Sequence, residues 1–150
     1  MSLKQKLQSD LNEAIKSRNT VSAETIRMIL AAITNEEVAG KEKKELSDAE
    51  VITVLTREAK KRREAAEAFE QGGRADKAAA ERAEGEVIAT YLPEQLSEAE
   101  LNQLITETIA AVGASGPSDM GKVMGALKAK VAGKADGATV SNLVKAALAK

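Results

Sequence analysis

The sequence predicts an all-α protein on three observations. Alanine, leucine, glutamate and lysine, which all favour helix, dominate its 150 residues. Apolar residues recur three and four positions apart through most of the chain, and no segment shows the alternation of a strand. The hydrophobic residues, 43% of the total, include one Phe, one Tyr and no Trp, so we expect an aliphatic core.

Two apolar stripes, separated by a polar break at residues 18–20, mark the first two helices. They have helical spacing and consist of Leu3, Leu7, Leu11 and Ile15, then Ile26, Ile29, Leu30 and Ile33. The second helix is expected to end near Gly40. The charged loop KEKKE that follows it is typical of a solvated turn.

The third helix is expected to begin in LSDAEV, where Ser47 and Glu50 form a capping box. It should end at Gly72-Gly73, and an alanine-rich fourth helix follows from about Arg74 to Tyr91. The inward positions of the third helix are predicted to be Val51, Ile52, Leu55, Ala59, Ala66 and Phe69.

The densest basic run of the chain, REAKKRRE at residues 57–64, has two interpretations. It could be a nucleic-acid patch, or it could be a solvated helix face on which opposite charges pair. The pairing interpretation is favoured, because acidic and basic residues stand four apart in Glu58–Arg62, Lys60–Glu64 and Arg63–Glu67.

A break follows at Tyr91-Leu92-Pro93, because proline disfavours helix in the residue before it. The capping-box signature then returns in LSEAEL, with Ser97 and Glu100, and opens a helix that should end at Gly113.

Two short helices complete the chain, and Ser118 and Asp136 are expected to cap them. We therefore predict an N-terminal helical domain of about four helices at residues 1–92. A small C-terminal three-helix domain is predicted at residues 93–150.

Composition excludes several classes of function. With no Cys and no His, the chain has no thiol nucleophile, no zinc–thiolate site and no imidazole base. We predict no catalytic residues, no metal site and no cofactor. The N-terminus has no apolar stretch of signal-peptide length, and no segment has the roughly 20 apolar residues of a membrane span. We expect a cytoplasmic protein without a membrane partner.

The segment GPSDMGKV, residues 116–123, has the spacing of a phosphate-binding Walker A loop except at its last position. Val123 stands where that loop needs a hydroxyl for magnesium. A phosphate loop also follows a β-strand, whereas the residues before Gly116 have helical spacing. The segment is therefore interpreted as a helix start.

The helix that begins there has an unusual outer face. Its core positions are Met120, Val123, Met124, Leu127 and Val131. Opposite them lie Lys122, Gly125, Ala126 and Ala129, a nearly bare surface with lysines at its margins. Such a surface lets a sugar-phosphate backbone approach closely, or it packs against the first domain or another helix.

The distribution of charge only partly distinguishes nucleic-acid binding from helix packing at this face. Residues 113–150 hold six Lys against two Asp, a net charge of +4, whereas residues 1–90 and 91–112 both have a negative net charge. The residues predicted to contact nucleic acid are Lys122, Gly125, Lys130, Lys134, Asn142 and Lys145. Lysines and an amide suit phosphate and sugar contacts, and this domain lacks aromatic residues that stack on single-stranded bases. A structured RNA recognised by its shape is the favoured nucleic-acid ligand.

Catalysis has little support in the residues. Ser118 and Lys122 stand four apart and could form a Ser–Lys pair, but Ser118 is better explained as a helix cap. No pair of carboxylates stands out from the surface glutamates.

Five segments resemble YqeY-like (GatB/YqeY) proteins and cover nearly the whole chain. They are SLKQKLQSDLNEAIKSRN, TIRMILAAITNEE, VLTREAKKRREAAEAFEQGGR, YLPEQLSEAEL and DMGKVMGALKAKVAGKADGATVSNLVK. The family's C-terminal domain is similar to the tail of the B subunit of the tRNA-dependent amidotransferase, which uses glutamine to convert Glu-tRNA(Gln) and Asp-tRNA(Asn). In that enzyme the tail helps to hold the tRNA, while the amide chemistry lies in other domains.

The resemblance thus implies a tRNA-binding or tRNA-amidotransferase-associated accessory protein, with tRNA or a tRNA-processing complex as partner. It also implies carbon–nitrogen ligase activity with glutamine as amido donor, although this chain lacks the domains that perform that chemistry. The alternative from the residues is a protein-interaction module that docks a partner helix on the small-residue face.

Overall fold

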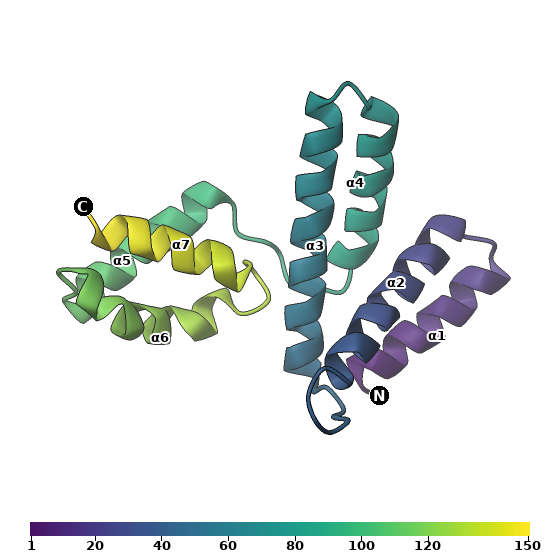
Figure 1. Ribbon diagram of the computed structural model, residues 1–150, viewed down its shortest axis with the longest axis horizontal. Coiled ribbons are helices and arrows are strands. Elements are labelled where there is room, and N and C mark those ends of the chain that lie inside the picture. Colours follow the sequence, from purple (N-terminus) through teal and green to yellow (C-terminus); the bar gives the residue numbers. More distant parts are fainter. The chain divides into compact units, whose positions relative to one another are not determined.

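The computed structural model describes residues 1–150 and contains seven α-helices, one 3₁₀ turn and no strand (Figure 1). The predicted all-α fold class is confirmed. The helices gather into two compact units, residues 1–93 and residues 94–150, each with its own apolar core.

The first unit consists of two helical hairpins. α1 (Leu3–Lys16) pairs with α2 (Thr20–Glu37), and α3 (Asp48–Gln71) pairs with α4 (Ala75–Ala89). α2 also packs against α3 and α4 and so joins the hairpins. The core they enclose is aliphatic, as expected, and consists of Leu7, Ile26, Ile29, Ile33, Val51, Val54, Leu55, Ala59 and Ile88.

Local signals position the helix ends in this unit. Ser47 and Glu50 form the predicted capping box at the start of α3, and Ser2 forms another with Gln5 at the start of α1. α3 ends at Gly72-Gly73 as predicted, with Gly73 in the left-handed conformation that glycine adopts most easily.

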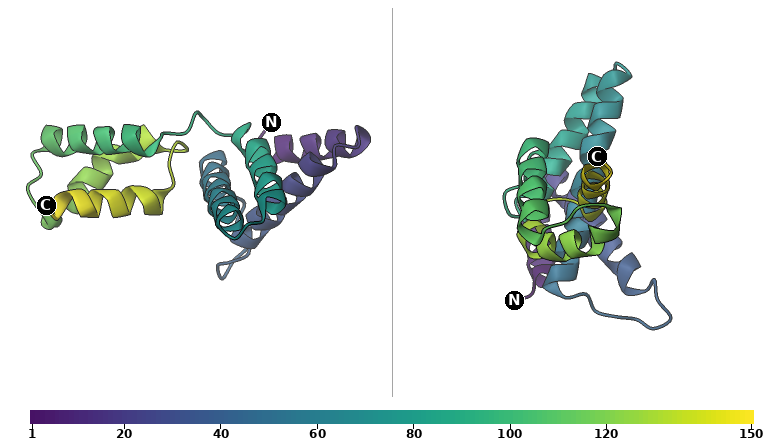
Figure 2. Two further views of the ribbon diagram at one scale, coloured as in Figure 1. Left: turned by 90° about the horizontal axis from the view of Figure 1, so that it is seen from above. Right: turned by 90° about the vertical axis from the view of Figure 1, so that its left-hand side faces the viewer.

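Figure 2 shows the loop between α2 and α3, residues 38–47. The buried carboxylate of Glu37 holds this loop. This carboxylate accepts hydrogen bonds from Lys4 Nζ at 2.8 Å and from the backbone N–H of Leu46 at 3.3 Å. The backbone N–H of Leu3 donates to Asp48 at 3.0 Å. Sequence patterning did not predict these long-range bonds, which tie the start of α1 to the end of α2 and the start of α3.

Three predicted core positions of the first unit are neither buried nor packed against its apolar core. Ile52 is half-buried. The other two lie closer to helix ends. Ile15, the last residue of the α1 stripe, is 47% exposed. Phe69 is only half-buried, and Lys77 Nζ lies 5.5 Å from the centre of its ring. Both residues belong to ends of helices, where periodicity continues beyond the packed core.

The second unit is a three-helix arrangement of α5 (Glu98–Val112), α6 (Met120–Val131) and α7 (Gly137–Leu148) (Figure 2). Each of the three packs against the other two. The predicted capping box of Ser97 and Glu100 opens α5, and the Asp136 side chain caps α7 by accepting from the Thr139 N–H. α5 ends at Gly113, which is left-handed with φ of 68°.

The predicted cap at Ser118 is wrong. Pro117–Asp119 form a 3₁₀ turn that leads into α6, so Ser118 lies inside this turn and its hydroxyl makes no capping bond. The side chain that orders the segment is Asp119, whose carboxylate accepts from the Ser115 backbone N–H at 2.9 Å. Asp119 folds back on the loop before it because the chain is already turning at Pro117.

Candidate nucleic-acid interface

α6 places three of the predicted contact residues on exposed positions. Lys122, Gly125 and Lys130 are all open to solvent, while Val123 and Leu127 are fully buried on the opposite side of the helix. Lys122 and Lys130 stand eight residues apart, roughly 12 Å along the helix axis at 1.5 Å per residue.

Gly125 is the centre of the small-residue face. A Cβ atom added there would meet nothing within 4 Å, so the glycine faces open space. Ala129 is exposed beside it. Packing within the second unit therefore does not explain why these residues are small.

The other three predicted residues follow α6 in the chain. Lys134 lies in the loop between α6 and α7, and Asn142 and Lys145 lie on α7, all exposed. The segment just before α5 holds the backbone of this loop: the Leu96 N–H donates to Lys134 O at 2.9 Å, and the Gln95 amide donates to Gly133 O at 2.6 Å. The backbone of the loop is thus fixed, while the Lys134 side chain extends into solvent.

The lysines of this unit share one electrostatic property: all six are exposed, and no side-chain ammonium group among them forms an ion pair or a hydrogen bond. They are Lys122, Lys128, Lys130, Lys134, Lys145 and Lys150. Their helical neighbours three and four residues away are mostly small or apolar, so acidic partners are lacking. The exception is Asp119, three residues before Lys122. The pKa of its carboxyl is lowered, chiefly by the hydrogen bond from Ser115, with a smaller effect from Lys122.

Four of the six acidic residues of the unit precede the lysines in the chain, while Asp119 and Asp136 lie among them. Glu98, Glu100 and Glu107 are exposed on α5, and Glu94 is exposed just before it. No basic residue lies between residue 83 and residue 121. The unit therefore has an acidic helix and a lysine-bearing pair of helices, although its net charge is zero.

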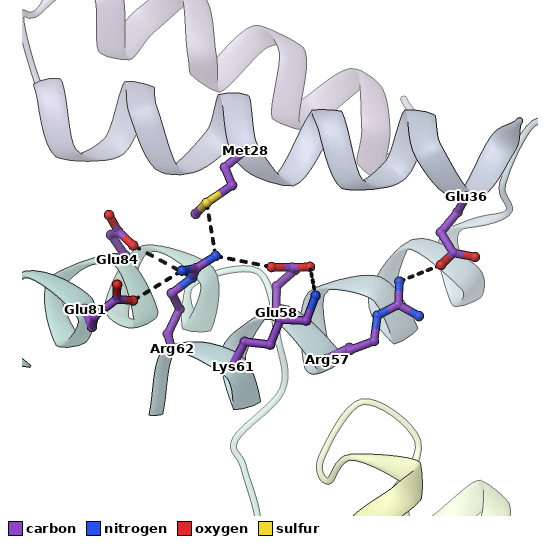
Figure 3. Close-up of polar contacts among 8 residues, drawn as sticks. All are labelled: Met28, Glu36, Arg57, Glu58, Lys61, Arg62, Glu81 and Glu84. Carbon is purple, nitrogen blue, oxygen red and sulfur yellow. Dashed lines mark hydrogen bonds and ion pairs between the residues drawn. The ribbon is translucent and has the colours of Figure 1, made fainter. Parts of the chain in front are cut away.

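The basic run of α3 has the opposite character, and Figure 3 shows why. Arg62 is mostly buried, with 18% of its side chain exposed, where α3 meets α2 and α4. Its guanidinium lies 3.4 Å from Glu58, 3.2 Å from Glu81 and 3.7 Å from Glu84. Nη2 also donates to the Met28 sulfur at 3.0 Å. This charged cluster is structural, so α3 does not offer Arg62 to nucleic acid.

The pairing interpretation of this run is correct in part. Glu58–Arg62 and Lys60–Glu64 pair as predicted, whereas Arg63 is exposed and forms no ion pair with Glu67. Two further pairs flank the cluster: Lys61 with Glu58 at 3.3 Å, and Arg57 with Glu36 at 2.7 Å (Figure 3). The burial of the charged cluster around Arg62, and the part that the α4 carboxylates Glu81 and Glu84 take in it, were not predicted. A Cβ atom added at Gly85 would lie in ordinary van der Waals contact with the Cβ of Arg62, at 3.7 Å, so α4 passes close to Arg62 at this residue.

Within the charged cluster, burial raises the pKa of the Glu84 carboxyl. The negative charge of Glu81 adds to this effect, and Arg62 opposes it. Ionisation of Glu84 is therefore disfavoured relative to a carboxyl in water.

Two observations bear on metal binding and on membranes. The structure contains no group of three or more His, Cys, Asp or Glu side chains that could hold a metal ion. None of its helices combines the length and the apolar composition that a bilayer-spanning segment needs.

Comparison with known proteins identifies the family. The model of the YqeY-like proteins matches residues 4–148, which is nearly the whole chain. The chain belongs to the YqeY-like family. One similar protein is "Altered inheritance of mitochondria protein 41, mitochondrial" from Pyrenophora tritici-repentis (strain Pt-1C-BFP). It is 29% identical over 133 residues, which cover 87% of this chain and 71% of that protein.

Proposed function

We propose that this YqeY-like protein is a tRNA-binding or tRNA-amidotransferase-associated accessory protein whose α6–α7 lysines contact the tRNA backbone. The observation that carries the proposal is the set of six exposed lysines without ion-pair partners. In the first unit, by contrast, most basic side chains are occupied by carboxylates. Unpaired ammonium groups bind phosphate at a lower cost, because no internal ion pair has to break.

The open face at Gly125 supports the same proposal. A ribose-phosphate backbone can lie close to the helix there, flanked by Lys122 and Lys130, with Lys134 and Asn142 contributing from the neighbouring loop and helix. We include Lys145 in this surface. We further propose that residues 1–92 and 93–150 are separate domains and that the second carries the binding surface.

A gel shift with bulk tRNA tests the proposal. The triple variant Lys122→Glu, Lys130→Glu, Lys134→Glu should lose the shift while its circular dichroism is unchanged. A control that reverses three exposed, unpaired cations of the first unit, Arg27→Glu, Lys41→Glu and Arg63→Glu, makes the same change in net charge and should retain the shift.

Salt dependence provides the second readout. With about four phosphate contacts, the affinity should fall by roughly 50- to 150-fold between 50 and 200 mM salt. A wild-type protein that shifts no tRNA at low salt, or a control triple variant that fails as badly as the α6 variant, contradicts the proposal.

A protein-interaction module remains the second candidate, and the open space at Gly125 favours it as well. Gly125→Leu adds a bulky side chain without a clash inside the fold, so it blocks the docking of a partner helix. A stoichiometric protein partner that survives nuclease and the triple lysine reversal, but is lost with Gly125→Leu, favours this candidate.

A cytoplasmic location is part of the proposal. The name of the Pyrenophora relative places that protein in mitochondria. Subcellular fractionation of this protein in its own cells distinguishes the two locations.

A further inference from the structure

The first unit contains an open cleft where the α1–α2 turn faces the end of α4. Its cavity volume is about 320 Å³. This is at the lower end of the range for small-molecule sites. The cleft plays no part in the proposed lysine surface, which lies wholly on the other unit.

The lining of the cleft is rich in oxygen and contains no basic side chain. Two carboxylates, Asp10 and Glu13, project from one face of α1, and four hydroxyl groups surround them. The hydroxyls are those of Ser17, Ser22, Thr90 and Tyr91. Apolar contact comes from Ala14, Ile26 and Val87. Such a lining suits a cation that carries an aliphatic body.

The fold already holds one alkylammonium group at the margin of this cleft. Lys6 Nζ lies 2.9 Å from Asp10 Oδ2 and 5.1 Å from the centre of the Tyr91 ring. A carboxylate and an aromatic face are the usual partners of an ammonium group. Asp10 and Tyr91 therefore have the chemistry to bind a second ammonium group.

Asp10 has acceptor capacity left for such a ligand. Both of its hydrogen bonds, from Lys6 Nζ and from the Tyr91 hydroxyl at 2.6 Å, go to Oδ2, so Oδ1 accepts none. The hydrogen bond from Tyr91 is the largest of the effects that lower the pKa of Asp10. Asp10 is therefore a carboxylate at neutral pH.

Glu13 supplies a second carboxylate that is available. Its pair with Lys16 is 3.7 Å long, with three quarters of each side chain exposed, so water competes with it effectively. Residues three apart on a helix have Cβ atoms about 5–6 Å apart. A short diamine can bridge two carboxylates at that spacing, whereas a monoamine engages only one of them.

We propose that this cleft binds an aliphatic diamine or polyamine, with one ammonium group on Asp10 and the Tyr91 ring and the next on Glu13. The apolar side chains contact the methylene chain between them. The hydroxyl of Thr90 and those of Ser17 and Ser22 can accept the remaining N–H donors.

The chain provides its own probe of this cleft. Tyr91 is the only tyrosine and there is no tryptophan, so the tyrosine emission of the full-length protein reports on the cleft wall. The ligands are 1,4-diaminobutane and spermidine, titrated at constant ionic strength and checked by isothermal calorimetry. Butylamine is the single-ammonium comparison, and MgCl₂ is the non-specific cation.

A saturable change in tyrosine emission is expected, with the diamine binding at least fivefold more tightly than butylamine. Glu13→Gln, whose side chain is exposed and does not hold the fold, should reduce diamine affinity to the butylamine level. Asp10→Asn should abolish binding of both amines. The matched control Glu42→Gln removes an exposed carboxylate outside the cleft and should bind as the wild type does.

Three results overturn the proposal. The first is an absence of saturable binding up to millimolar amine. The second is an equal response to MgCl₂, which indicates charge screening. The third is an unchanged diamine affinity in Glu13→Gln, which places the ligand elsewhere. None of these results bears on tRNA binding by the second unit.

Discussion

Replacing Arg62 by methionine should severely destabilise the first unit. Methionine keeps much of the aliphatic length but removes the cation, leaving the carboxylates of Glu58, Glu81 and Glu84 facing one another. Removing one partner of a fully buried ion pair costs about 3–5 kcal/mol, and an exposed pair contributes about 0–1 kcal/mol. Arg62 is 18% exposed, which places it nearer the buried limit.

We therefore expect a loss of about 2–3 kcal/mol in the free energy of unfolding at neutral pH. In a unit of this size that corresponds to a fall in Tm of roughly 10–20 °C. The measurement is urea and thermal denaturation, followed by far-ultraviolet circular dichroism. The loss should shrink on acidification, beginning with Glu84, because its pKa is already raised and it protonates early.

The neighbouring Arg63 is the matched control, since it is exposed on the same helix and forms no ion pair. Arg63→Met removes the same charge and should change the unfolding free energy by less than about 0.5 kcal/mol. The reasoning is refuted if the two variants have equal stability, or if the loss in Arg62→Met does not depend on pH.

Three further predictions concern stability. Glu84→Gln should stabilise the protein at neutral pH by about 0.5 kcal/mol. A carboxyl with a raised pKa contributes stability below its unfolded pKa and loses it as pH rises through the folded value. The advantage of Glu84→Gln should therefore vanish in denaturation curves recorded below pH of about 4, and an advantage that persists there contradicts the cause. Arg18→Gly should raise the unfolding free energy by about 0.5–1 kcal/mol, because Arg18 has φ of 59° in the turn after α1. Gly113→Ala should cost about 1 kcal/mol at a similar position after α5, and urea denaturation measures both.

The parts of the fold that depend on local chemistry were predictable from sequence. The capping boxes at Ser47 and Ser97 and the cap at Asp136 involve residues three positions apart, and all three are confirmed. Ser118 failed as a cap because the 3₁₀ turn at Pro117 moved the start of α6 beyond it. That turn depends on how the chain leaves α5, which a capping pattern does not describe.

The charged cluster was not predictable in the same way. Helical spacing identified Glu58 and Arg62 as a pair, but the pair's burial depends on α4, some twenty residues later in the chain. The six predicted nucleic-acid contacts are all exposed, as a contact surface requires. Whether they act together on one ligand is a property of that ligand, and it stays a prediction.

The long-range hydrogen bonds of α1 have a consequence for the order of folding. Its contacts are with residues far along the chain: Lys4 with Glu37, Leu3 with Asp48, and Asp10 with Tyr91, which is 81 residues away. During synthesis α1 and α2 can form a hairpin early, since their contacts are local. The last of these bonds cannot form until Tyr91 has left the ribosome. α1 is synthesised before the other six helices, yet it is among the last to form all of its tertiary hydrogen bonds.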